Sequence, residues 1–154
     1  MHLTELQLRD WSKIDVRFYT DDASDLTCLT ILVIKYVGVY RWGSEGYPDA
    51  VYMRAMAKAG LDAFEPWCVI YDLSELSYAW GNNINIIFPN VGIEPPPVPV
   101  AVVLGPNCEP GMPHLYSLLA TDEYVDRGEF VYFRRLDFAW KYVNARFADS
   151  EKKL

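Results

Sequence analysis

A cysteine and a histidine lie six residues apart in the second half of the chain and could form a nucleophile and its base. Cys108 and His114 follow the apolar segment 100–104, and in α/β proteins functional residues usually collect at the carboxyl ends of such strands. A thiolate beside an imidazole can attack a carbonyl carbon. The spacing matches no established nucleophile motif, so a small hydrolase or transferase that uses this pair stays an alternative hypothesis.

Other side chains that could act in catalysis or in ligand binding have simpler structural roles. Asp72 and Glu75 lie at the end of the apolar segment 67–73 and could act as an acid–base pair, although capping and turn formation suit them better. The loop 105–111 (GPNCEPG) lacks the lysine of a phosphate-binding loop, and Glu109 would repel a phosphate. The histidines at 2 and 114 have no carboxylate at helical spacing, so we expect neither a metal site nor a cofactor.

The elements that would position these residues alternate between strands and helices. Segment 13–20 alternates apolar and polar residues, which is typical of a half-buried strand, whereas 27–37 is almost continuously apolar and suits a central one. Segment 81–88 is compatible with a helix or a strand, and we favour the helix; the proline-rich segment 94–99 is a stiff connector. The remaining strands are expected at 67–73, 100–104 and 130–134, and the remaining helices at 48–64, 113–124 and 136–147.

The order ββαβαβαβα predicts an α/β fold, with a single mainly parallel sheet flanked by helices and a hairpin strand at one edge. The 154 residues would form one domain, 1–154, with flexible ends at 1–12 and 149–154. Three cysteines without CxxC spacing indicate reduced thiols, of which Cys28 and Cys68 would lie in strands. The sequence begins without a signal-peptide pattern, so we expect a cytoplasmic protein.

Charge is the most distinctive property of the sequence. The net charge of −7 argues against binding to nucleic acid or to an anionic membrane. No Lys or Arg occurs between Lys58 and Arg127, an interval that contains nine acidic residues. Several of these would follow strands and form an acidic rim that steers a basic protein partner, although a merely solvated surface is equally compatible with the pattern. Trp42, Tyr78 and Trp80 would add aromatic anchors to this rim.

The segment Val69-Ile70-Tyr71-Asp72-Leu73-Ser74-Glu75-Leu76-Ser77-Tyr78 resembles the strand and loop of STAS domains, the family of anti-sigma-factor antagonists and sulfate-transporter tails. In that family Asp-Leu-Ser ends an apolar strand, and Asp-Ser-Ser-Gly then opens a helix. The resemblance implies the STAS fold and binding to other proteins. The phosphorylatable serine of the family would fall near Gly81 or Asn82, where this chain has no hydroxyl, and the nearby Ser74 and Ser77 suit capping or turn roles.

These patterns lead to one main functional hypothesis and an alternative besides the enzyme. The main hypothesis is a non-catalytic acidic protein-binding module of bacterial origin, in concrete terms a toxin-neutralising immunity protein that covers a basic partner. The alternative is a STAS-like regulatory protein that binds a kinase or an anti-sigma factor. The candidate partner-binding residues are Trp42, Asp72, Glu75, Tyr78, Trp80 and Glu109.

Overall fold

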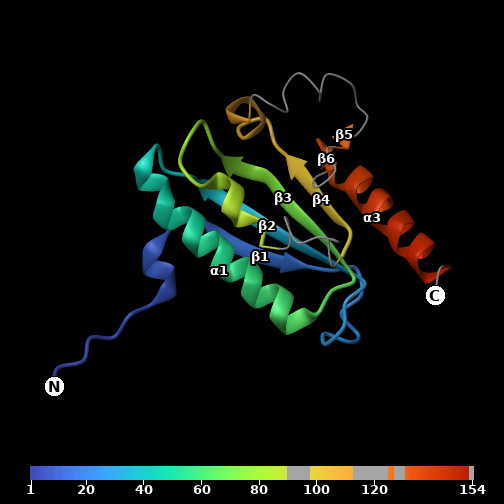
Figure 1. Ribbon diagram of the computed structural model, residues 1–154, viewed down its shortest axis with the longest axis horizontal. Helices are drawn as coiled ribbons and strands as arrows, with labels where there is room; N and C mark the ends of the chain where they lie inside the picture. The colour runs from blue at the N-terminus through green and yellow to red at the C-terminus, as the bar shows by residue number, and fades with distance from the viewer. Residues whose placement is uncertain (90–97, 113–124, 127–130, 153–154) are drawn as a thin grey trace.

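The computed structural model of the protein describes residues 1–89, 98–112, 125–126 and 131–152, which are built around a six-stranded sheet (Figure 1). The strands are β1 (Asp15–Tyr19), β2 (Ile31–Val39), β3 (Cys68–Ser77), β4 (Val100–Leu104), β5 (Val125–Asp126) and β6 (Val131–Phe133). Their order across the sheet is β1-β2-β3-β4-β6-β5. The four inner strands are parallel, and β1 and β5 pair antiparallel at the two edges. The expected α/β architecture with a mainly parallel sheet is therefore confirmed.

Two long helices cover opposite faces of this sheet. Helix α1 (Tyr47–Phe64) crosses in front of β1 and β2 in Figure 1, and α3 (Leu136–Glu151) lies beside β4 and β6. Short 3-10 helices complete the described chain: η1 (Leu8–Trp11), η2 (Ser44–Gly46), η3 (Ile84–Ile87) and η4 (Glu109–Gly111). Pro48 in the first turn of α1 needs no helical hydrogen bond, which explains why this helix begins here.

The central strand β2 is buried on both of its faces. Leu32, Ile34 and Tyr36 pack under α1, whereas Ile31 and Val33 belong to the second core cluster, under α3. Because side chains alternate along a strand, a continuous apolar run can fill both cores at once. The near-continuous apolar character of this segment therefore predicted its central place correctly.

Some element boundaries differ from the prediction. The strand expected from residue 27 begins at Ile31, so Cys28 lies outside it and is exposed. Segment 81–88 holds only the short helix η3, and the two-residue edge strand β5 was not expected. The helix expected at 113–124, together with His114, lies outside the described residues.

Strand β3 is longer than the pattern indicated. It continues from Leu73 through Ser77, so Asp72 and Glu75 lie within the strand and not after its end. The extended part of β3 pairs with the end of β2, and the Lys35 ammonium group contacts both carboxylates across the neighbouring strand. The β2–β3 pairing shifts register between Lys35 and Val37 and then resumes up to Val39 and Ser77.

Candidate functional site

The loops after β2, β3 and β4 join into one continuous surface at the carboxyl edge of the sheet. The amide of Tyr40 donates to the Ser77 carbonyl at 2.9 Å, and the amide of Tyr78 donates to the Asn107 carbonyl at 2.9 Å. Beyond these bonds Gly43 and Gly81 form an isolated parallel bridge. The loops therefore prolong the pairing of their strands, and their backbones are held in place by one another.

Glycine is required at the bridge because the backbones approach closely there. A Cβ atom on Gly81 would lie 2.7 Å from Cε1 of Tyr40 and 2.9 Å from the Arg41 carbonyl oxygen. Gly43 has a φ of +57° and would place a Cβ 3.0 Å from the Trp80 ring. A serine at position 81 consequently does not fit this backbone unless it rearranges, whereas Asn82, the other position where the serine of the STAS motif would fall, is exposed.

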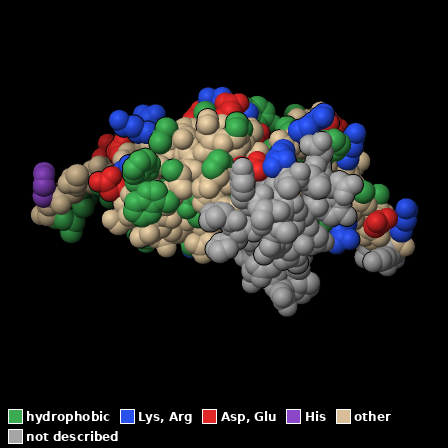
Figure 2. Space-filling view, turned by 90° about the horizontal axis from the view of Figure 1, so that it is seen from above, with side chains coloured by type: hydrophobic (Ala, Val, Ile, Leu, Met, Phe, Trp, Pro, Cys, Tyr) green, Lys and Arg blue, Asp and Glu red, His purple; other side chains and the backbone are tan. Residues whose placement is uncertain are grey.

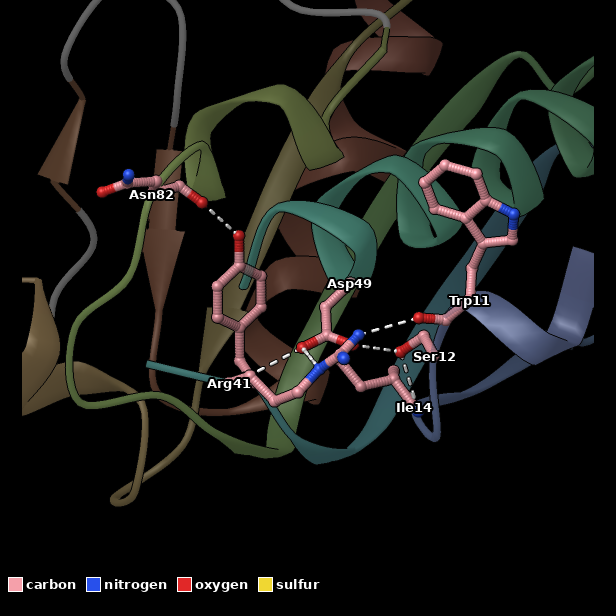
Figure 3. A network of polar contacts seen from close by, with 7 residues as sticks. Trp11, Ser12, Ile14, Arg41, Asp49 and Asn82 are labelled. Carbon is pink, nitrogen blue, oxygen red and sulfur yellow. Dashed lines mark hydrogen bonds and ion pairs between the residues drawn. The ribbon is translucent and has the colours of Figure 1, made fainter. Parts of the chain in front are cut away.

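Three tyrosine hydroxyls donate hydrogen bonds to backbone carbonyls of the segment after β3. Tyr40 donates to the Asn82 carbonyl at 2.5 Å (the dashed line to Asn82 in Figure 3), and Tyr36 donates to the Ile87 carbonyl at 3.0 Å. Tyr78 donates to the Gly81 carbonyl at 3.2 Å, and its ring packs edge to face on Tyr40. Burial raises the pKa of Tyr36 and of Tyr40, so both hydroxyls keep their protons. Segment 81–87 is thus fixed through its backbone carbonyls.

Two tryptophans project from this rigid base. Trp42 is 63% exposed and Trp80 is 57% exposed, and they directly flank the bridged glycines in sequence. Figure 2, seen from above, shows hydrophobic side chains gathered between the N-terminal tail and the grey residues. We call Trp42, Gly43, Trp80 and Gly81 the tryptophan surface. Of the predicted contact residues, these two tryptophans lie on loops that the glycine bridge joins, whereas Tyr78 is buried with its ring against Tyr40.

The three acidic candidates are ion-paired. Asp72 is 3% exposed and lies 3.7 Å from the Lys35 ammonium group, which also donates to Glu75 at 2.5 Å. This hydrogen bond lowers the pKa of Glu75 and raises that of Lys35. Glu109 is buried and accepts two hydrogen bonds from Arg134, at 2.7 and 3.1 Å.

The pairing changes the interpretation of the acidic interval. Lys35 and Arg134 lie outside the stretch between Lys58 and Arg127, so a count along the sequence could not find them. Each of the three candidate carboxylates has a cationic partner, but Asp72 and Glu75 share the single charge of Lys35, while Glu109 pairs with Arg134. Only one net negative charge of the three is left, and it lies beside Lys35.

A buried carboxylate that the sequence analysis did not single out positions the loop after β2. Asp49, in the first turn of α1, is 1% exposed and accepts hydrogen bonds from the Arg41 guanidinium, the Arg41 amide and the Ser12 hydroxyl (Figure 3). Arg41 also donates to the carbonyl of Trp11 at 2.7 Å. Burial opposes the charge of Asp49, but these hydrogen bonds outweigh it and lower the pKa. An acidic residue after the proline of a first helical turn is the local signal that marks this position.

The thiol of Cys108 is unsuited to nucleophilic chemistry. It is fully buried, and burial, assisted by the adjacent Glu109, raises its pKa to about 12. A reactive cysteine needs an accessible thiolate, which this environment disfavours. Among the described residues, no three His, Cys, Asp or Glu side chains gather as a metal site would require.

Comparison with known proteins supports the fold. No protein-family model and no curated protein matches the sequence. Among solved structures, the chain is similar to the crystal structure of an anti-sigma factor antagonist from Mycobacterium paratuberculosis, with a TM-score of 0.58 and 18% sequence identity over 86% of this chain and 95% of the other. The fold is therefore STAS-like, as the sequence resemblance implied. No helix in the described part of the chain is long and apolar enough to span a membrane.

Proposed function

We propose that this chain is a non-catalytic regulatory domain with a STAS-like fold that binds a protein partner through the tryptophan surface. The observation that carries the proposal is the placement of two exposed tryptophans on a backbone fixed by a glycine bridge and by tyrosine hydroxyls. Tryptophan is among the residues most enriched at binding hot spots. A rigid base also reduces the entropy that is lost on association.

A kinase or an anti-sigma factor is the class of partner that we favour. The similar solved structure is an anti-sigma factor antagonist, and this chain covers 95% of it. Because a serine does not fit at Gly81, we propose that binding here is independent of phosphorylation at that position. The immunity-protein hypothesis depends on the net charge of −7, and the ion pairing of Asp72, Glu75 and Glu109 weakens it.

The proposal is tested by comparing what matched tryptophan variants retain from a lysate of the natural host. Trp42→Ala and Trp80→Ala remove the two anchors, whereas Trp67→Ala removes a tryptophan that is 52% exposed just before β3, at the amino end of the strand. We expect a kinase or an anti-sigma factor to be retained by the parent protein and by Trp67→Ala, and lost from the other two variants. Retention of a small basic protein, released by salt, would instead favour the immunity hypothesis.

A further inference from the structure

A hollow of about 510 Å³ opens on the α3 side of the sheet, away from the tryptophan surface. Helix α3 packs on β3, β4 and β6, and its first turns form one wall of the hollow through Leu136 and Trp140. The opposite wall comes from Tyr19 and Asp21 at the end of β1. The hollow exists because α3 does not extend across β1 and β2.

The base of this hollow carries an ion pair where an apolar pair would be expected. Lys35 and Asp72 are register partners on β2 and β3, and both line the hollow. The preceding residues on the same face, Val33 and Ile70, are apolar and buried. A buried ion pair is seldom more stable than a well-packed apolar pair. Charge at this position therefore suggests a role in binding.

The charge balance of the hollow favours a positively charged ligand. Lys35 supplies one positive charge, against the negative charges of Asp72, of Asp21 and of the adjacent Glu75. The neighbouring Arg17, opposite Lys35 on β1, is already paired with Asp15 at 2.7 Å. Tyr19 and Trp140 add aromatic rings to the walls, and such rings attract cations.

We propose that this hollow binds an arginine side chain of a protein partner. A guanidinium group is planar and stacks on aromatic rings, and it forms paired hydrogen bonds with carboxylates such as Asp21 and Glu75. The aliphatic part of the arginine would pack on Val33 and Leu136, which are among the apolar residues that line the hollow. No residue of the tryptophan surface lines this hollow, so the proposal can be tested independently of the proposed function.

The test is an NMR titration of the ¹⁵N-labelled full chain with N-acetyl-arginine methylamide, and in parallel with N-acetyl-glutamate methylamide. We expect the arginine probe to shift the Trp140 indole N–H and the Asp21 amide, with a dissociation constant in the millimolar range. The indole N–H of Trp67, which packs against Phe147 in the last turns of α3, should stay unchanged. Equal shifts with the glutamate probe, or no shift at the hollow, would overturn the proposal.

Two variants assign the binding to the hollow. Asp21→Asn removes a wall carboxylate from an exposed loop, so the fold should persist while affinity for the arginine probe falls by about threefold or more. Asp62→Asn is the matched control, because Asp62 is an exposed carboxylate on α1 that pairs with Lys58. Equal affinities of the parent protein and Asp21→Asn, or an equal loss in both variants, would contradict binding at this site.

Discussion

The guanidinium group of Arg41 contacts both carboxylate oxygens of Asp49, with Nε at 3.0 Å from Oδ2 and Nη2 at 2.9 Å from Oδ1. Asp49 simultaneously accepts a hydrogen bond from Ser12 at 2.6 Å. One carboxylate therefore joins the segment before β1, the loop after β2 and the start of α1. The base of the tryptophan surface depends on this connection.

Replacing Asp49 with Asn should lower the free energy of unfolding by about 2 kcal/mol at neutral pH, because hydrogen bonds to a buried charge are lost. The pKa of Asp49 in the folded protein lies below 3.8, so its charge contributes fully above that pH, and the contribution disappears as the pH falls through the folded-state pKa. Urea unfolding of the parent protein and of Asp49→Asn at several pH values measures this pH-dependent difference in stability. The exposed Asp62→Asn control should change stability by less than about 0.5 kcal/mol.

Introducing a serine at position 81 should destabilise the protein by about 1–3 kcal/mol, because its Cβ would overlap Tyr40 and the Arg41 carbonyl. Asn82→Ser is the matched control, since Asn82 is exposed and its backbone supplies the hydrogen bonds. Chemical denaturation of both variants gives the comparison. A Gly81→Ser protein as stable as the parent would show that the glycine bridge rearranges.

Removing the hydroxyl of Tyr40 should loosen the segment that it holds. Tyr40→Phe loses the hydrogen bond to the Asn82 carbonyl and should cost about 1 kcal/mol. Hydrogen exchange followed by mass spectrometry should show faster exchange in peptides that cover 81–87. The exposed Tyr47→Phe variant should exchange like the parent protein, and equal protection in both variants would argue against the role of the Tyr40 hydroxyl.

The three thiols should differ sharply in reactivity. Cys28 is exposed, whereas burial raises the pKa of Cys68 to about 11 and that of Cys108 to about 12. At pH 8 Ellman's reagent should therefore modify one thiol rapidly in the native protein and all three after unfolding. Fast modification of Cys108 in the native protein would revive the enzyme hypothesis.

The Lys35–Asp72 pair can be measured by a double-mutant cycle. Lys35→Met leaves a buried carboxylate without its ammonium partner and should cost about 3 kcal/mol. The double variant Lys35→Met with Asp72→Leu should recover most of this loss, because an apolar pair suits the surrounding core. A double variant that is as unstable as the sum of the single variants would show that the pair does not interact.

The fold could be predicted from the sequence wherever a local pattern determines the structure. The apolar run that became β2 and the helix that follows Pro48 were both expected, because periodicity and capping signals depend on neighbouring residues. The extension of β3 past Asp72 was missed because it depends on pairing with the end of β2, which lies far away in the sequence. Local patterns contain no information on such partners.

The candidate site was predictable only in part, for the same reason. The exposed Trp42 and Trp80 were expected near loops, but the bridge that brings their loops together depends on glycines 38 residues apart in the chain. Glu109 was expected on an exposed loop, whereas it is buried beside Arg134. Distances between charges in space decide the electrostatics of a surface, and the sequence shows only distances along the chain.

The stretch 40–43 has a further consequence for engineering the protein. Tyr40 donates a hydrogen bond to the Asn82 carbonyl, and Arg41 donates to the Asp49 carboxylate. Gly43 forms a backbone bridge with Gly81, so almost every residue of this loop contacts a different part of the chain. Exposed polar loops are normally the places that accept inserted sequence. Here an epitope or linker placed after β2 would disrupt these contacts, whereas the exposed segment 22–28, which does not line the hollow, should accept one.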